Sequence, residues 1–291
     1  MVDFRRSLFR YRTAMSSGLS ALTWLVALLA CVPLFSVLYM LAVRGGSRLS
    51  WAVFTELPPA AFDPGGGFGN AIVGTAVMVG IAALLSVPLG ILIALFMAEF
   101  EPGGRTTRVA RFCAKTLTGL PSILAGVFAY AAVVLLTGSY SAVAGGVALA
   151  LLMLPTVVLT AEEALRMVPR AMREAAVGMG CNPSQVVFKV VLPTAWSAVL
   201  TGVMLAVARA SGETAPLLFT ALFSDYWLRQ NGDWALMEPT ASLAVLIYNY
   251  SGMPFDNQIE LAWAASLVLV LMILSINVLS RLLSARGKIH R

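Results

Sequence analysis

Long stretches of apolar residues without charge constrain this chain more than any other feature of its sequence. Residues 19–43, 70–98 and 116–161 contain no Asp, Glu, Lys or Arg. A helix needs about 20 apolar residues to cross the hydrocarbon core of a bilayer. The chain is 59% hydrophobic and only 12% charged, which is about half the charge of an ordinary soluble domain. The pattern predicts an all-α, polytopic membrane protein and argues against a water-soluble enzyme.

Six membrane-spanning helices fit this pattern. The run 116–161 is too long for one span, so we expect it to fold back at residues 138–140, where turn-forming residues cluster. Residues 1–18 form a predicted basic tail, and residues 19–291 a single membrane domain with a loop over 162–193 on one side and loops over 44–69 and 224–260 on the other. The predicted spans cover residues 19–43, 70–98, 116–137, 141–161, 194–223 and 261–281.

The positions of the basic residues predict the orientation of the chain. With six spans, sixteen of the 20 Lys and Arg lie on the side of the termini, and only Arg44, Arg48 and Arg229 lie on the other side. Because Lys and Arg accumulate in cytoplasmic segments, both termini are predicted to be cytoplasmic. The net charge of +6 is then explained by orientation, and we expect no nucleic-acid partner.

The loop over residues 162–193 carries the most specific pattern. Glu174, Ala175 and Ala176 are followed by Gly180, and Leu192-Pro193 follow at a fixed distance. A short helix is predicted to begin at Pro169 and to end at Gly178 and Gly180, and a second to run from Ser184 to Pro193. Two short helices joined by a glycine turn would make a rigid projection that fits a cleft on a partner. The alternative is an ordinary amphipathic loop.

The predicted fifth span contains two charged residues, Arg209 and Glu213. A charge at the centre of a spanning helix costs about 2.5–3.5 kcal/mol, so such side chains usually face the bundle interior or a wet path. Arg209 and Glu213 could neutralise each other or a partner subunit. Alternatively, Arg209 lines a path for an oxyanion, which a guanidinium fork binds well, and Glu213 holds or gates that path.

The sequence contains few residues that could form a metal, catalytic or nucleotide-binding site. Cys31, Cys113 and Cys181 are too far apart for a zinc or Cys-x-x-Cys motif, and His290 is the single histidine. The glycine run 65–67 lacks the Lys-Ser/Thr of a phosphate-binding loop. We therefore expect no metal site, no catalytic residues and no ATP site in this chain. Gly74, Gly80 and Gly90 are expected to pack helices closely rather than to line a pore.

Several of these segments together resemble one family. Residues 174–193 match the docking-loop pattern of ATP-binding-cassette (ABC) importer permeases, with Val190 in place of Ile. Residues 209–221, and residues 69–75, 119–123 and 247–250, resemble the phosphate-specific PstA-type permeases, with Ala244 where a Pro is expected. The similarity covers roughly residues 60–285 and implies the type I ABC importer permease fold, which is MetI-like.

The resemblance also implies a function and a set of partners. It implies uptake of inorganic phosphate across a bacterial inner or plasma membrane, with Glu174, Ala175, Ala176, Gly180, Leu192 and Pro193 coupling to an ATPase. The implied partners are a second permease (PstC-type), two ATPase subunits (PstB-type) that hold ATP and Mg²⁺, and a phosphate-binding protein (PstS-type).

Three alternatives remain open at this point. The chain could be a permease of the same class for sulfate, molybdate or phosphonate. It could be an ion-coupled secondary transporter with Glu213 as its proton site, although the sequence has no convincing internal repeat. It could also be a structural membrane scaffold, in which Arg209 and Glu213 would tolerate apolar replacement.

Overall fold

The computed structural model describes residues 11–230 and 232–286, and these are mainly helical. The predicted basic tail is therefore described only from Tyr11, where a helix has already begun, and Arg5, Arg6, Arg10 and His290 lie outside the described residues. The long helices are α1 (Tyr11–Met40), α3 (Gly69–Leu95), α4 (Arg105–Thr118), α7 (Ala142–Arg166), α10 (Leu192–Ser211) and α13 (Asp256–Arg286). The shorter elements are α2 (Ala52–Thr55), α5 (Ser122–Ala129), α6 (Leu135–Thr137), α8 (Arg170–Gly178), α9 (Pro183–Val186), α11 (Ala215–Leu218), α12 (Leu243–Ser251) and the hairpin β1 (Arg229–Gln230) with β2 (Asp233–Trp234).

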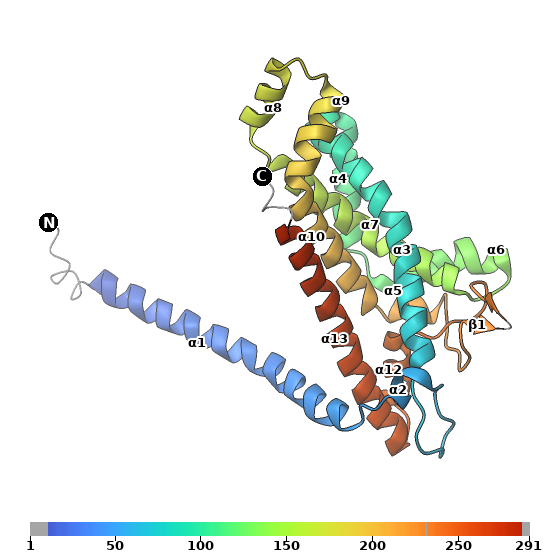
Figure 1. Cartoon of the computed structure of the whole chain (residues 1–291). Coiled ribbons are helices and arrows are strands. Elements are labelled where there is room, and N and C mark those ends of the chain that lie inside the picture. The colour runs from blue at the N-terminus through green and yellow to red at the C-terminus, as the bar shows by residue number, and fades with distance from the viewer. Residues whose placement is uncertain (1–10, 231, 287–291) are drawn as a thin grey trace.

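Five helices are long and apolar enough to cross a membrane, and a bent helix pair makes a sixth candidate. This confirms the predicted all-α, polytopic fold. In Figure 1, α3, α7, α10 and α13 form a bundle, with α8 and α9 at one end and α2 and α12 at the other. We call these the α8 end and the α12 end. The five single candidates are Met15–Gly45, Gly69–Phe100, Ala142–Arg166, Pro183–Ser211 and Asp256–Leu279.

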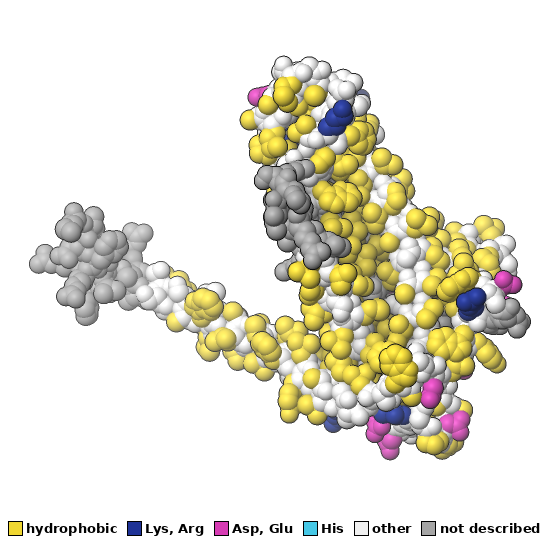
Figure 2. Space-filling model, viewed as in Figure 1, with side chains coloured by type: hydrophobic (Ala, Val, Ile, Leu, Met, Phe, Trp, Pro, Cys, Tyr) yellow, Lys and Arg dark blue, Asp and Glu magenta, His cyan; other side chains and the backbone are white. Residues whose placement is uncertain are grey.

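The surface of this bundle has the character of a membrane protein. Apolar side chains cover most of the face shown in Figure 2, and the charged side chains visible there gather towards its ends. The core lies between α3, α7 and α10, where Met78, Leu149 and Val203 are among the buried residues. Helix α1 leaves this bundle and projects from the α12 end (Figure 1), and its apolar side chains, such as Trp24 at 72% exposure, are open to the surroundings.

The third span is not the single straight helix that the sequence predicts over 116–137. The candidate in this place consists of α4 and the segment Ser122–Thr137, which are bent by 104° at the break between them. Pro121 precedes the first residue of α5 with ψ 132°, so the backbone is extended there, and a proline without an N–H group suits this position because no helical hydrogen bond is lost. The predicted basic connection 99–115 is consequently mostly helix. Its apolar residue Ala114 is buried against α7, while Arg108 is exposed.

The fifth span also differs from the prediction of 194–223. It runs without interruption from Pro183 to Ser211, through α9, a π-helical turn (Val187–Val191) and α10. The span passes Pro193 directly after this π-helical turn, a local widening of the kind found at kinks in helices. It stops at Ser211 because the ring of Pro216 would clash with the carbonyl of Gly212. Glu213 therefore lies just beyond the helix rather than inside it.

The predicted loop 162–193 is correspondingly shorter. Residues 162–166 belong to α7, and residues 183–193 belong to the fifth span, so the second short helix is the beginning of that span. Helix α13 likewise begins at Asp256, within the predicted loop 224–260. The sequence placed these boundaries at charged residues, whereas the helices continue past the charges to the next proline or glycine signal.

Two of the three glycines expected to pack helices do so. A Cβ atom added to Gly74 would lie 2.0 Å from the carbonyl oxygen of Ala241, and one added to Gly90 would lie 2.7 Å from Val157 Cγ1. Gly80 is different, because a Cβ added there would meet nothing within 4 Å. The close approach at Gly74 also lets the neighbouring Thr75 Oγ1 accept a hydrogen bond of 2.9 Å from the N–H of Leu243.

These two environments on α3 give a matched pair of variants. Gly74→Ala is expected to destabilise the protein by about 1–3 kcal/mol, because the added methyl meets backbone that cannot move away easily. Gly80→Ala is expected to cause no loss. Thermal unfolding of the purified complex in detergent measures both, and equal melting temperatures for the two variants would contradict the packing assigned to Gly74.

Candidate transport site and docking segment

Arg209 and Glu213 form an ion pair at the break in the fifth span. Arg209 lies in the last turn of α10, and its Nε is 3.6 Å from Glu213 Oε1. The Arg209 side chain is 50% exposed and that of Glu213 is 18% exposed. Glu213 therefore neutralises the charge of Arg209, while half of the Arg209 side chain is not covered by the described residues. The ion pair between Arg209 and Glu213, which was one of the two alternatives from the sequence, is therefore present in the structure.

The break that holds Glu213 is fixed by a contact with the bend in the third span. Helix α11 packs against α5, and a Cβ added to Gly126 of α5 would lie 2.6 Å from Pro216 Cα. Thr220 adds a further tie, because its carbonyl oxygen accepts a hydrogen bond of 2.9 Å from the N–H of Ser141. The two motifs around residues 119–126 and 209–221 therefore meet in space, although about 90 residues separate them.

A groove of about 500 Å³ runs along α10 towards this ion pair. Thr201, Leu205 and Ala208 line it from α10, Thr160 and Glu163 from α7, and Asn277 from α13. Ala208 is the lining residue nearest to the ion pair along α10, and Arg209 follows it in the sequence without itself lining the groove. This face of α10 is left open by the chain's own helices, as the exposure of Thr201, Leu205 and Arg209 shows.

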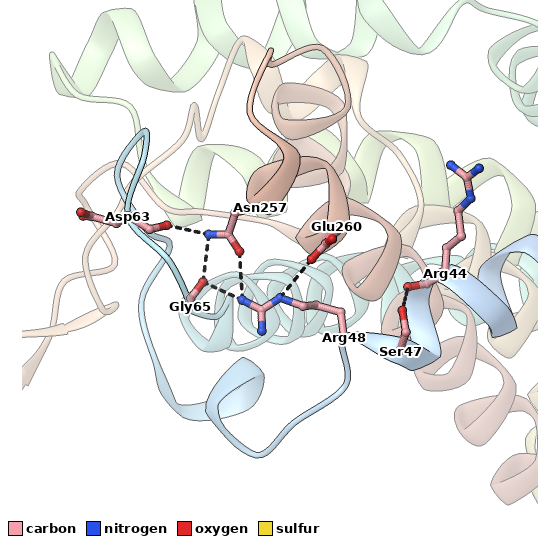
Figure 3. A network of polar contacts seen from close by, with 7 residues as sticks. All are labelled: Arg44, Ser47, Arg48, Asp63, Gly65, Asn257 and Glu260. Atoms are coloured by element: carbon pink, nitrogen blue, oxygen red, sulfur yellow. Dashed lines mark hydrogen bonds and ion pairs between the residues drawn. The ribbon is translucent and has the colours of Figure 1, made fainter.

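At the α12 end, polar contacts join the outer segments to the bundle. Figure 3 shows Arg48 donating hydrogen bonds to Gly65 O (2.9 Å) and Asn257 Oδ1 (3.0 Å), while its Nε lies 3.8 Å from Glu260 Oε2. Asn257 in turn donates to Asp63 O at 2.8 Å. Arg48 entered the sequence argument only as an orientation signal. The structure shows that it also ties the segment after α1 to the beginning of α13.

Two titratable groups at the α12 end are perturbed by burial. Burial raises the pKa of Asp225, and burial together with the nearby Asp225 charge raises the pKa of Tyr250 to about 12. The Tyr250 hydroxyl donates a hydrogen bond of 3.4 Å to Pro59 O. Because this pKa is so high, the phenol keeps its proton and this hydrogen bond at every physiological pH.

At the α8 end, Glu174 and Ala175 lie on the exposed face of α8, whereas Ala176 is 1% exposed. Gly180 follows the helix with φ +85°, and the N–H groups of Gly180 and Cys181 donate to the carbonyls of Val177 and Ala176. This is a Schellman turn with glycine at its left-handed position. Asn182 and Gln185 then form a capping box that starts α9.

Leu192 and Pro193 lie in the first turn of α10, not in the loop that the sequence predicts. Leu192 packs against the apolar cluster that contains Ala176, Val186 and Val191. The spacing between Glu174–Gly180 and Leu192-Pro193 is therefore the length of chain that α8 needs to turn back and pack on the fifth span. Ala176 must be small because it is buried at this contact.

Ion pairs that the sequence analysis missed hold α8 and α7 in place. Arg173 of α8 makes a bidentate contact with Glu99, at 3.1 and 2.6 Å, and donates to the carbonyl oxygens of Leu165 and Val168. Glu162 is paired with both Arg111 and Arg166. Three of the residues counted as orientation signals therefore also carry structural contacts. The available signal was the presence of Glu99 and Glu162 at the ends of uncharged stretches.

The Schellman turn gives a second matched pair of variants. Gly180→Ala places a side chain on a residue in the left-handed region and is expected to lower the stability of the turn between α8 and α9 by about 1–2 kcal/mol. Gly178→Ala, inside α8, is expected to be neutral. Since neither glycine has a neighbour within 4 Å of an added Cβ, the comparison isolates backbone conformation. Thermal unfolding of the purified protein is the measurement, and equal melting temperatures for both variants would contradict the strain assigned to the turn.

A bundle of apolar helices with a charged break in one span, and two short helices at one end, is typical of the membrane-embedded subunit of a transporter. Residues 86–288 match the model of the family described as binding-protein-dependent transport system inner membrane component. The chain belongs to this family and, within it, groups with the PstA permease proteins.

Two relatives and one solved structure illustrate the similarity. The chain is 38% identical over 274 residues to "Phosphate transport system permease protein PstA" of Haemophilus influenzae, which covers 94% of this chain and 95% of that protein. It is 36% identical to the protein of the same name from Yersinia pestis, over 94% of this chain and 88% of that one. The inward-facing MetNI methionine ABC transporter superposes with a TM-score of 0.60 at 17% identity, over 75% of this chain and 94% of the other. This superposition shows the MetI-like permease fold.

Proposed function

We propose that this chain is a transmembrane subunit of an ABC importer that takes up inorganic phosphate. The observation that carries the proposal is the half-exposed Arg209 guanidinium, held at 3.6 Å from Glu213 at the break of the fifth span. A guanidinium fork binds a tetrahedral oxyanion through parallel hydrogen bonds. The relatives named as phosphate transport permeases support phosphate as that anion.

The transport path lies along the open face of α10. The groove of about 500 Å³ is lined by α7, α10 and α13 of this chain, and a second permease of the PstC type covers its open side. Phosphate released by a PstS-type binding protein at the α12 end then passes Arg209 and enters the groove. Glu213 is paired with the Arg209 guanidinium while no anion is bound. When phosphate binds, it replaces the Glu213 carboxylate as the negatively charged partner of Arg209.

The α8 end is the cytoplasmic end in this proposal, with both termini cytoplasmic and the chain in a bacterial inner or plasma membrane. Two PstB-type ATPase subunits hold ATP and Mg²⁺, and this chain binds neither. The exposed face of α8, with Glu174, Ala175 and Val177, docks on one ATPase subunit. Movement of the ATPase subunits then reaches the bundle through α8 and changes which end of the groove is open.

Transport by the purified four-component complex in proteoliposomes tests this proposal. We expect uptake of radiolabelled phosphate to require ATP on the side of the membrane where the ATPase subunits lie. It should also require the binding protein on the opposite side. A complex with a PstB-type subunit unable to hydrolyse ATP is the control. Uptake that persists without ATP hydrolysis but collapses with an uncoupler would contradict the proposal and favour an ion-coupled carrier.

Competition in the same assay separates phosphate from other oxyanions. Unlabelled phosphate is expected to reduce the labelled uptake in proportion to its concentration, whereas sulfate and molybdate at equal concentrations are expected to have little effect. Stronger competition by sulfate or molybdate would keep the class of transporter and change its substrate.

A further inference from the structure

A second cluster of basic side chains surrounds a cavity at the α8 end. The cavity, of about 640 Å³, lies where the end of the second span, α4, α7 and α8 come together. Its lining includes Arg111 from α4, Arg166 from α7, and Arg170 and Arg173 from α8, with Glu99 as the acidic residue among them. None of its lining residues belongs to the groove along α10 or to the ion pair of Arg209 and Glu213, so the cavity is separate from the proposed transport site.

The charges around this cavity do not balance. Four guanidinium groups face two carboxylates, because Glu162 is shared by Arg111 and Arg166 and Glu99 is paired with Arg173. Each carboxylate is nearly buried, with 5% exposure for the Glu162 side chain and 8% for that of Glu99. The cluster therefore keeps an excess of two positive charges.

The hydrogen-bond donors show which arginines are available to a ligand. Arg173 uses Nε, Nη1 and Nη2 in contacts with Glu99, Val168 and Leu165, so its role is structural. Arg166 contacts Glu162 through Nη2, and Arg111 does so through Nε and Nη2. Arg170 has no partner among residues 11–230 and 232–286. Since a guanidinium has five N–H donors, Arg111, Arg166 and Arg170 keep donors that face the cavity.

We propose that this cavity binds a phosphate group, held by Arg111, Arg166 and Arg170. A phosphate group carries one or two negative charges and offers several acceptor oxygens, which matches both the charge excess and the free guanidinium donors. The three arginines come from α4, α7 and α8. A ligand held by all three ties the docking helix to two membrane helices, and so it stabilises the position of α8.

Two sources can supply such a group at this place. One is the head group of an anionic phospholipid, because α4 is amphipathic and exposes Val109 and Phe112 beside its basic residues, as helices in the membrane interface do. The other is free phosphate in the compartment at the α8 end. Both present the same tetrahedral oxyanion to the cavity, and the experiment below distinguishes them.

The test compares Arg170→Gln with Arg108→Gln in the purified complex of the two permease and two ATPase subunits, without the phosphate-binding protein. Both variants remove one exposed positive charge at the same end, but Arg108 does not line the cavity. In the first arm, binding of radiolabelled inorganic phosphate is measured in nanodiscs of phosphatidylcholine alone, in an Arg209→Gln background that removes the transport site. In the second arm, phosphatidylglycerol retained by the complex is counted by native mass spectrometry.

We expect Arg170→Gln to weaken binding about tenfold in one of these arms, since one charge-assisted contact is lost, and Arg108→Gln to leave it unchanged. A loss in the first arm identifies free phosphate as the ligand, and a loss in the second identifies a lipid head group. Equal behaviour of the two variants in both arms overturns the proposal. Phosphate uptake by the Arg170→Gln complex with Arg209 intact is scored separately, so failure here leaves the transport function standing.

Discussion

Replacement of Arg209 by glutamine is expected to abolish phosphate uptake while the complex still assembles in the membrane. The variant removes the half-exposed guanidinium at the break of the fifth span and leaves the Glu213 carboxylate, 18% exposed, without its counter-charge. A phosphate ion approaching this point then meets a negative charge and no cation. Uptake in proteoliposomes is the measurement, and we expect a loss of at least a hundredfold, the scale of two strong charge-assisted hydrogen bonds.

Two further variants separate a transport role from simple neutralisation. If Arg209 only neutralises Glu213, the double variant Arg209→Gln with Glu213→Gln should transport normally, because neither charge remains. If Arg209 binds phosphate, the double variant stays inactive. Arg209→Lys keeps the charge but not the fork, and we expect it to retain part of the activity. Full uptake by the double variant would remove Arg209 from the proposed path.

Replacement of Arg173 by glutamine is expected to have the second large effect, at the other end of the fifth span. Arg173 holds α8 to Glu99 and to two carbonyl groups at the end of α7. Breaking a buried ion pair by removing one partner costs about 3–5 kcal/mol, because a buried charge is left alone. We expect a lower melting temperature and a loss of phosphate-stimulated ATP hydrolysis in the complex.

Controls for Arg173 are available on both sides of the contact. Arg108→Gln removes a positive charge from the same end without breaking an ion pair, and we expect wild-type ATP hydrolysis. Adding Glu99→Gln to Arg173→Gln removes the stranded charge, so stability should partly recover while ATP hydrolysis stays low. Normal ATP hydrolysis in the Arg173→Gln variant would show that α8 keeps its position without the contact between Arg173 and Glu99.

The sequence predicted the class of fold because membrane insertion depends on the length of apolar segments, a property that is read along the chain. It predicted the helix ends less well. Pro121 stands at a break in a span, whereas Pro88, Pro155 and Pro193 are passed by continuous helices, and local residue patterns do not separate the two cases. The prediction therefore placed the start of the third span and both ends of the fifth about a dozen residues from their observed positions, whereas the third span ends at Thr137 as expected.

The candidate site shows the same division. The spacing of Arg209 and Glu213 predicted that they could pair, because contacts four residues apart are local. The contact of Gly126 with Pro216 and the pairing of Arg173 with Glu99 join residues far apart in the chain. Such contacts depend on how the spans pack, and one sequence without its relatives does not determine that.

The unbroken fifth span also has a mechanical consequence. Its 29 residues make a rod about 43 Å long, at 1.5 Å per residue. One end of the rod is packed against α8, and the other carries Arg209. A tilt of about 5° about the α8 end displaces the far end by about 4 Å over this length. Glu213 lies beyond the rod, in the segment fastened to α5, so the ion pair spans a joint between two bodies. A small rotation where α8 meets the rod is enough to open or close that joint.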